Sequence, residues 1–394
     1  MMISNKSAGI FKEFFDSEKA GGLLLIICTI ISIILANTSI GDGYLHFWHG
    51  HINLSFSKIQ LNYSAEHWVN DGLMTVFFLM VGLEIERELY IGELADFKNA
   101  LLPIMAAIGG MIVPASIHFF FNHGTATQSG IGIPMATDIA FALGILSLAG
   151  DKIPASVKIF LTALAIIDDL GAVIIIAIFY TKGLSLLYLF ISLGIFGLLL
   201  LFNRFKIKSM VFYLLPGIVM WYCMLHSGVH ATVSGILLAF AIPFDKQGSN
   251  LSEKVQHFLH KPVAFFILPV FALANTCITL SSGWQNTLLS NNSLGIIAGL
   301  FFGKPAGIIL LCFAAVQLKI CRLPIGMQWG HLSGVGVLAG LGFTMSIFIA
   351  NLAFQDAGHI QESKIAILAG SLLAGLSGLF FLKKLSNKES EQGF

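Results

Sequence analysis

Charge is the scarcest property of this 394-residue sequence, because Asp, Glu, Lys and Arg together make up only 11% of it. Soluble proteins carry roughly 25% charged residues, so the chain has too few to cover the surface of a water-soluble protein of its length. This scarcity disfavours aqueous enzymes, nucleic-acid binders and disordered scaffolds. The formal net charge of +1 indicates no partner of either sign.

Cysteine is also scarce, and its placement argues against disulfide bonds and metal sites. The five cysteines are odd in number and scattered, and no two form a Cys-x-x-Cys pair. Neither a disulfide framework nor a zinc site is therefore predicted, and no cofactor is expected. The five are Cys28, Cys223, Cys277, Cys312 and Cys321.

Apolar residues are abundant instead, at 56% of the chain with a mean hydropathy of +0.85. A membrane span needs about 20 mostly apolar residues, and twelve segments approach this length. The sequence therefore predicts an all-α polytopic membrane protein of about twelve transmembrane helices, in one domain over residues 1–382. The segments lie at approximately 20–36, 68–85, 100–121, 130–149, 157–180, 184–202, 209–225, 227–243, 262–277, 294–316, 330–354 and 364–382.

The basic residues support this count and predict an orientation. If the N-terminus is cytoplasmic, all but four of the 22 Lys and Arg residues fall in segments on the inside. Such asymmetry follows the positive-inside rule. Both chain ends are then cytoplasmic, with residues 1–19 as an amphipathic segment at the interface and 383–394 as a tail, disordered from Ser386. The four exceptions are Lys58, Lys182 and Lys364 outside and Lys304 within a span.

The long outside loop, residues 37–67, has the period-two alternation of a short β-hairpin. Its apolar positions alternate with polar ones on both sides of Ser57-Lys58. A lone hairpin is marginally stable in water, so we expect it to pair, for example with the same hairpin of a second subunit. An unpaired surface loop is an equal alternative. The alternating positions are Ile52, Leu54, Phe56, Ile59, Leu61 and Tyr63.

Four ionisable residues lie where the sequence predicts lipid. Asp138 is in the middle of 130–149, the adjacent Asp168 and Asp169 are in the middle of 157–180, and Lys304 lies within 294–316. An ionisable residue at membrane depth is costly and marks function by default. A purely structural role is a serious alternative for Asp138 or Lys304 taken singly, but a weaker one for two adjacent carboxylates.

Two buried, adjacent carboxylates can hold either protons or a small cation. Burial and a neighbouring like charge both favour their protonated form, so the pair is expected to exchange protons near physiological pH. When deprotonated, their oxygens suit a hard cation. Competition between protons and a cation at one site that opens alternately to each side is sufficient for antiport. An exchange of two protons for one monovalent ion would also move net charge.

Backbone interruptions fall beside these charges. Pro134 precedes Thr137-Asp138, Pro305 follows Lys304, and a glycine-rich run, 340–344, interrupts the span 330–354. Transporters place their sites near the midplane, where broken helices of inverted repeats meet. Spans three to five and ten to twelve are therefore predicted to form two repeats of opposite orientation, in which the unwound ends of the broken helices face one another. Asp138 and Lys304 would offset the partial charges of the broken ends.

Six stretches resemble the NhaA-type sodium/proton antiporters of bacteria. They are spread over essentially the whole chain, and the Asp-Asp and Thr-Asp motifs are highly specific together. Members of this family are known inverted-repeat transporters, so the resemblance and the repeat prediction are not independent. The stretches are Val69–Met74 (VNDGLM), Ala136–Gly144 (ATDIAFALG), Ala165–Gly171 (AIIDDLG), Ser227–Thr232 (SGVHAT), Gly303–Pro305 (GKP) and Gly340–Ala350 (GLGFTMSIFIA).

The resemblance implies a transporter in the bacterial inner membrane, not an enzyme, with twelve spans that include two crossed discontinuous helices. It implies efflux of sodium or lithium driven by proton entry, activated at alkaline pH, by a homodimer joined through the outside hairpin. Asp168 and Asp169 would bind the ion with help from Thr137. Asp138 and Lys304 would compensate charge at the helix ends. From the residues alone either carboxylate of the pair could be the partner of Lys304, and the resemblance favours Asp168.

The resemblance also nominates residues for the ion funnel and the pH response, with two departures from the family. Glu86 stands where the family often has a basic residue, and Gln256 stands where some members have an acid implicated in pH response. Both departures leave the pH set point open. The nominated residues are Asp71, Glu84, Glu88, His230 and His257, and a structural role for His230 is equally open.

Three other functions remain as alternatives from the residues alone. An intramembrane aspartyl protease needs two aspartates on different helices, one in a Gly-x-Gly-Asp setting, whereas Gly340-Leu341-Gly342 is followed by Phe343. A passive cation channel needs a ring of acids or carbonyls around a pore, and a lysine among the carboxylates argues against it. A symporter needs a pocket for an organic substrate.

Overall fold

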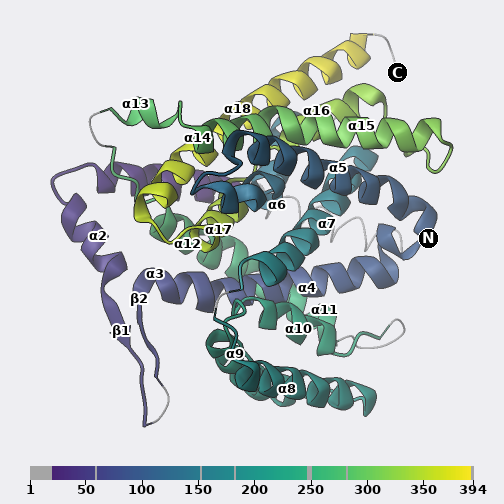
Figure 1. Ribbon diagram of the computed structural model, residues 1–394. Coiled ribbons are helices and arrows are strands. Elements are labelled where there is room, and N and C mark those ends of the chain that lie inside the picture. Colours follow the sequence, from purple (N-terminus) through teal and green to yellow (C-terminus); the bar gives the residue numbers. More distant parts are fainter. Residues whose placement is uncertain are drawn as a thin grey trace. The chain divides into compact units, whose positions relative to one another are not determined.

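The structure, a computed structural model, describes residues 20–57, 60–150, 153–181, 183–245, 251–280 and 283–391, and helices make up most of it (Figure 1). Among these residues, seven helices are long and apolar enough to cross a membrane, or up to ten if each of three bent helix pairs is one span. The chain is therefore a multi-pass membrane protein. The count of twelve spans stays a prediction, and the expected amphipathic segment 1–19 lies outside the described residues.

Two predicted spans coincide with helices that are short for a bilayer. α9 (Val211–Ser227) has 17 residues and α10 (Val233–Ala241) has 9. At about 1.5 Å per residue, neither reaches the roughly 30 Å of the hydrocarbon core. The first predicted span, Ala20–Ala36, is helical and is followed at a bend of 114° by α2 (Gly41–His49).

Contacts divide the chain into two compact units, the first made of residues 1–26, 93–172 and 281–394 and the second of 27–92 and 173–280. The first unit contains the carboxylate pair. After the Ala20–Ala36 helix, which begins in it, its elements are η2 (Glu93–Ala95), α5 (Phe97–Asn122), η3 (Gln128–Met135), α6 (Ile139–Leu148), most of α7 (Ala155–Phe179), α13 (Trp284–Thr287), α14 (Asn291–Ala298), η5 (Gly299–Gly303), α15 (Lys304–Gln317), α16 (Trp329–Ala339), α17 (Phe343–Ala353) and α18 (Ala357–Glu391).

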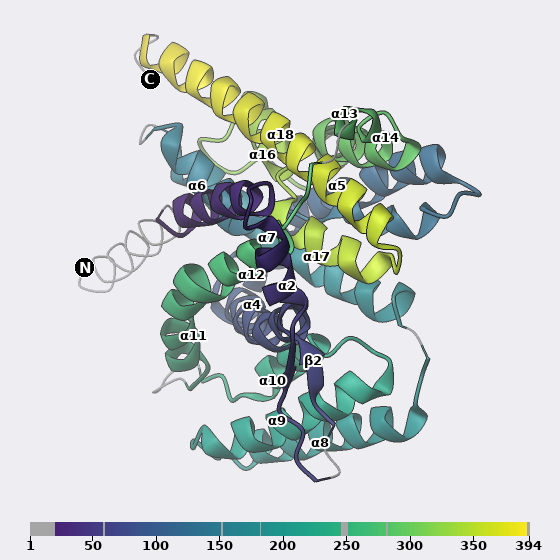
Figure 2. The same ribbon diagram turned by 90° about the vertical axis from the view of Figure 1, so that its left-hand side faces the viewer.

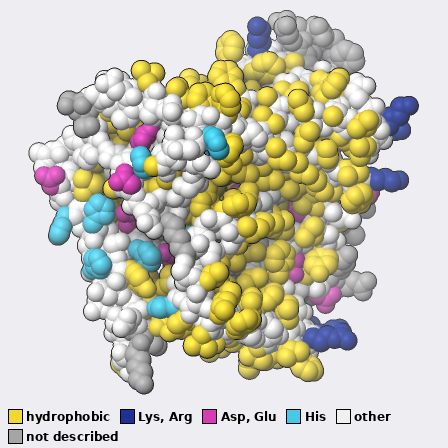
Figure 3. Space-filling view, viewed as in Figure 1, with side chains coloured by type: hydrophobic (Ala, Val, Ile, Leu, Met, Phe, Trp, Pro, Cys, Tyr) yellow, Lys and Arg dark blue, Asp and Glu magenta, His cyan; other side chains and the backbone are white. Residues whose placement is uncertain are grey.

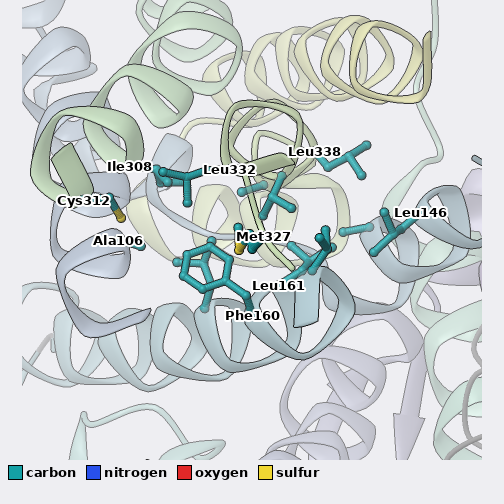
Figure 4. Packing of buried hydrophobic residues seen from close by; sticks show 14 of the residues in the cluster. Ala106, Leu146, Phe160, Leu161, Ile308, Cys312, Met327, Leu332 and Leu338 are labelled. Carbon is teal, nitrogen blue, oxygen red and sulfur yellow. The ribbon is translucent and has the colours of Figure 1, made fainter. Parts of the chain in front are cut away.

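Close backbone contact and a large apolar cluster hold the first unit together. α5 and α15 touch through two glycines, since a Cβ on Gly109 would lie 2.1 Å from the carbonyl oxygen of Gly307. Beside this contact, side chains of α5, α6, α7, α15 and α16 form a buried cluster (Figure 4). Its labelled members are Ala106, Leu146, Phe160, Leu161, Ile308, Cys312, Met327, Leu332 and Leu338.

Two helices of this unit are broken where the sequence predicts interruptions. η3 and α6 are bent by 40° around residues 136–138, and α16 and α17 by 44° around residues 340–342. Glycine is required at the second break, because a Cβ on Gly340 would lie 2.4 Å from the carbonyl oxygen of Leu300. The two breaks are therefore confirmed, while the relation of the flanking spans as inverted repeats stays a prediction.

The second unit packs helices around α4, again through small residues. A Cβ on Gly235 of α10 would lie 2.3 Å from the carbonyl oxygen of Thr75, and one on Gly82 would lie 2.6 Å from the Cβ of Ala239. α8 and α9 lie side by side (Figure 2). Its further elements are α3 (Ala65–His67), η1 (Trp68–Leu73), α4 (Met74–Ile91), α8 (Leu186–Arg204), α11 (Leu251–Pro262), η4 (Val263–Ile267) and α12 (Leu268–Asn275).

Apolar side chains gather over the centre and right of the visible surface (Figure 3). α8 illustrates this, with Leu187 and Phe190 exposed by 69% and 67%. In water such a face would be unfavourable by roughly 25 cal/mol per Å² of apolar area. Lipid removes that cost, in agreement with a helix that lies in a bilayer.

The predicted β-hairpin is present, although its strands are short. β1 (His51–Asn53) pairs antiparallel with β2 (Asn62–Ser64), and Ile52 lies opposite Tyr63. This register pairs residues on the two sides of Ser57-Lys58, as the alternation predicts. Pairing with a second subunit stays a prediction.

The expectation of disorder from Ser386 is wrong for most of the tail. α18 continues from the last predicted span to Glu391. Its final segment is rich in leucine, lysine and glutamate, which are good helix formers, and has neither proline nor glycine before Gly393. The helix therefore propagates past the apolar stretch because nothing in the local sequence stops it.

Candidate functional site

Five polar residues predicted for the site come together in the first unit. Asp168 and Asp169 lie in α7, Lys304 begins α15, Asp138 caps α6, and Thr137 lies in the break before it. Each side chain belongs to a residue that is exposed by 2% or less. Because unpaired charges are costly in such a place, their partners define what the site can do.

Lys304 pairs with Asp168, which answers the question that the sequence leaves open. Its Nζ lies 2.9 Å from Oδ2 of Asp168. The same ammonium donates a hydrogen bond to the carbonyl oxygen of Met135, the last residue of η3. The lysine stem passes close to Gly110 of α5. Lys304 therefore compensates one carboxylate and the carbonyl end of one broken helix.

Asp138 binds the amino ends of both broken helices. Its Oδ1 accepts the backbone N–H of Phe141, 3.0 Å away, at the start of α6. Its Oδ2 accepts the N–H and the hydroxyl of Thr344 in α17, at 3.1 Å and 2.5 Å. Its own N–H donates to the carbonyl of Leu341 at 2.6 Å. One carboxylate thus offsets the positive ends of two helices.

Thr137 links the carboxylate pair to the second break. Its hydroxyl lies 2.7 Å from Oδ2 of Asp168 and 3.0 Å from the carbonyl oxygen of Ala339, the last residue of α16. A hydroxyl has one proton to donate, so it serves one of these acceptors at a time. An ionised Asp168 attracts this proton, whereas a protonated Asp168 leaves it for Ala339.

Asp168 has a buried carboxylate oxygen that can take a further ligand. Oδ1 of Asp168 is buried, and no described residue donates a hydrogen bond to it. Asp169 is adjacent in α7, and its charge also acts on Lys304. A buried carboxylate oxygen without a donor is unfavourable, and either a proton or a small cation would satisfy it. The surrounding carboxylate, hydroxyl and carbonyl oxygens are the ligands that hard cations prefer.

Sequence reasoning missed two hydroxyl residues that join the two broken helices. Thr344 lies in a stretch that resembles the known family, but no role was predicted for its contact with Asp138. Ser346 donates to the carbonyl of Ile133 at 2.6 Å and so joins α17 to η3. The available signal was a cluster of hydroxyl residues directly after the glycine-rich break, where unpaired N–H groups are expected.

Replacing Thr344 by valine is expected to lower the free energy of unfolding by about 1.5–3 kcal/mol, because the hydroxyl donates to a buried carboxylate. Thr344→Ser keeps the hydroxyl and should stay close to the parent chain. Thermal or denaturant unfolding of the purified protein in detergent measures the change. Thr162→Val is the matched control, since that hydroxyl bonds only within its own helix, to Lys158. Equal losses in the two valine variants would contradict the contribution of the Asp138 contact.

The residues predicted for the ion funnel lie in the second unit. Oδ2 of Asp71, in η1, is 3.1 Å from Nε2 of His67, and its backbone carbonyl accepts the indole N–H of Trp221 at 2.9 Å. His230 contacts the carbonyl oxygen of Tyr180 through Nε2 at 3.1 Å. His230 thus has the hydrogen bond that a structural histidine would have.

The acids predicted for the pH response lie on α4, and both departures from the family are at its contact with α11. Gln256 of α11 lies beside Glu84, and both side chains are buried. Glu86, also buried, accepts a hydrogen bond from the hydroxyl of Ser252 at 2.9 Å. Glu88 pairs with Arg87 at 3.0 Å. The neighbouring His257 is exposed on α11.

Comparison with known proteins finds one family along nearly the whole chain. Residues 12–382 match the family described as Na⁺/H⁺ antiporter 1. A protein of Flavobacterium psychrophilum named Na(+)/H(+) antiporter NhaA is 60% identical over 379 residues, 96% of this chain and 97% of the relative. Proteins of the same name from Cytophaga hutchinsonii and Dechloromonas aromatica are 56% and 57% identical, over 98% of this chain in each case and 100% and 98% of the relatives.

Proposed function

The chain belongs to the Na⁺/H⁺ antiporter 1 family, and on that premise we propose that it exports sodium in exchange for protons. The observation that carries the proposal is the buried Asp168 carboxylate, held by Lys304 and Thr137 at two broken helices while its second oxygen stays available. Asp168 and Asp169 are the ion-binding residues, with Thr137 as a third ligand. Lithium, a second small hard cation, is expected to be exchanged as well.

Exchange follows from competition for the same oxygens. A sodium ion bound between the two carboxylates competes with Lys304 for Oδ2 of Asp168, and protonation of both carboxylates removes the negative charge that holds the ion. Because protons and sodium exclude each other, binding on one side and release on the other couples their movements. Two protons for one sodium ion makes the exchange electrogenic.

Alkaline activation has its origin in the same competition. At low pH protons occupy the carboxylates and sodium binding is weak, whereas at high pH the carboxylates are ionised and bind sodium. The second unit adjusts this response through Glu84, Glu88 and His257, while Asp71 and His230 border the ion funnel. Asp138 and Lys304 compensate the helix ends throughout.

The expected setting is a bacterial inner membrane, with both chain termini in the cytoplasm and two subunits joined through the β-hairpins. The basic residues of the predicted inside segments support this orientation. The apolar surface of helices such as α8 supports contact with lipid.

Everted membrane vesicles that carry the protein test the proposal. A pH-gradient dye is followed while sodium, lithium, potassium or choline is added at several pH values. We expect dye recovery with sodium and lithium only, rising toward alkaline pH, and none in vesicles without the protein. Absence of recovery with every ion, in vesicles shown to contain folded protein, would contradict antiport and favour a channel, a symporter or a protease.

A further inference from the structure

The amino end of α17 is held by side chains from other helices. Its capping residue, Gly342, has no side chain to accept the first N–H groups. Thr344 donates its N–H to Asp138, and Phe343 donates its N–H to the hydroxyl oxygen of Ser371 in α18, at 3.2 Å. The first N–H groups of a helix have no partner within the helix, and a hydrocarbon environment supplies no water for them. Ser371 therefore provides an acceptor that this end requires.

A face of small residues brings α18 against the break. Gly375 and Ala374 contact the broken segment: a Cβ on Gly375 would lie 3.1 Å from Cδ2 of Leu341, and one on Gly340 would lie 3.1 Å from the Cβ of Ala374. Ser371 lies one turn before them on the same side, because residues three and four apart share a helix face. It is exposed by only 5%. The close packing places its hydroxyl directly at residue 343.

Ser371 is connected to the carboxylate pair by three hydrogen-bonded contacts, which two pairs of chain neighbours join. It binds Phe343, whose neighbour Thr344 binds Asp138 through two hydrogen bonds. Asp138 follows Thr137 in the chain, and the hydroxyl of Thr137 donates to Asp168. Loss of the Ser371 contact would leave the first turn of α17 less firmly held. Asp138 binds that turn, and the neighbouring Thr137 would shift with Asp138.

We propose that Ser371 is a positioning residue for ion exchange, which rests on the function proposed above. Its hydroxyl oxygen fixes the first turn of α17 and, through Thr344 and Asp138, the oxygen ligands around Asp168. It does not itself touch the ion. α18 thereby takes part in exchange although the carboxylates, the lysine and both breaks lie on other helices.

Vesicle exchange with Ser371→Ala and Ser371→Thr tests this role. Leaving one buried donor unpaired shifts an equilibrium by roughly tenfold, so the alanine variant should raise the apparent KM for sodium by about tenfold, while the maximal rate changes by less than about twofold. The threonine variant keeps the hydroxyl and should restore the parent KM. Hydrogen–deuterium exchange of the backbone amides of residues 341–346 should be faster in Ser371→Ala than in the parent chain and in Ser371→Thr.

The matched control is Ser377→Ala, which removes a half-buried serine from the same helix, and the structure gives that side chain no hydrogen bond among the described residues. The proposal would be overturned by an unchanged KM in Ser371→Ala or by the same rise of KM in Ser377→Ala. It would also be overturned if Ser371→Ala lowered only the maximal rate and Ser371→Thr did not restore that rate. If the alanine variant does not accumulate, Ser371→Cys is measured instead, because the thiol is of similar size and a weaker acceptor. Its KM for sodium should also rise, and an unchanged KM would overturn the proposal. Absence of exchange in the parent chain would instead contradict the proposed antiport.

Discussion

Sodium-dependent proton movement is expected to disappear when Asp168 is replaced by asparagine. The amide keeps the shape of the side chain but can neither ionise nor release a proton, so the competition between proton and cation is lost. The dye signal with sodium should fall to that of vesicles without the protein, at every pH. In this variant Lys304 no longer contacts an ionised carboxylate. The amount of variant protein in the membrane must therefore be measured together with the exchange activity.

The same result is expected for Asp169→Asn, because both carboxylates are needed to hold the ion. Asp96→Asn is the matched control: Asp96 is exposed and caps α5 by accepting the N–H of Lys98, and asparagine caps helices equally well. It should exchange like the parent chain. Full exchange by either well-expressed variant of the pair would refute the site assignment.

Replacing Lys304 by methionine is expected to lower the free energy of unfolding by about 3–5 kcal/mol. Removing one partner of a buried ion pair leaves the other charge uncompensated, and here Asp168 and the carbonyl of Met135 both lose the ammonium of Lys304 as a donor. Methionine matches the length of the lysine stem, so little of the loss arises from packing. Thermal or denaturant unfolding in detergent measures it, and exchange should be lost as well.

A double variant separates the charge effect from other losses. Lys304→Met combined with Asp168→Asn removes both charges and should recover much of the stability without recovering exchange. Lys98→Met, at an exposed position of α5, should leave stability nearly unchanged. If Lys304→Met unfolded like the parent chain, the ion pair would contribute nothing to the fold.

Local patterns account for the features that could be predicted. The alternation around Ser57-Lys58 predicts the centre of the hairpin, because side chains of a strand alternate with period two and a turn links them. Pro134 and the glycines at 340 and 342 predict the broken helices because these residue types disturb helical hydrogen bonding or permit close approach. Isolated charges in apolar runs predict the site because nothing in lipid compensates them.

Helix ends were predicted less well. Hydropathy alone does not show where a helix stops, so α18 extends to Glu391 through charged but helix-forming residues. Hydropathy also does not reveal that a segment as short as α10 packs closely against α4 through Gly235. Length and apolar content identify a segment as a candidate span, whereas its contacts with other helices determine how it packs.

The sequence by itself determined the class of protein, the positions of most helices, the two breaks and the identity of the buried charges. Only the tertiary structure decided that Lys304 pairs with Asp168, that Asp138 binds the ends of two helices, and that Ser371 reaches α17. Adjacent residues on a helix point about 100° apart, so the rotation of α7 about its axis determines which of its two carboxylates faces Lys304. That rotation is set by contacts between segments far apart in the chain, which no local pattern encodes.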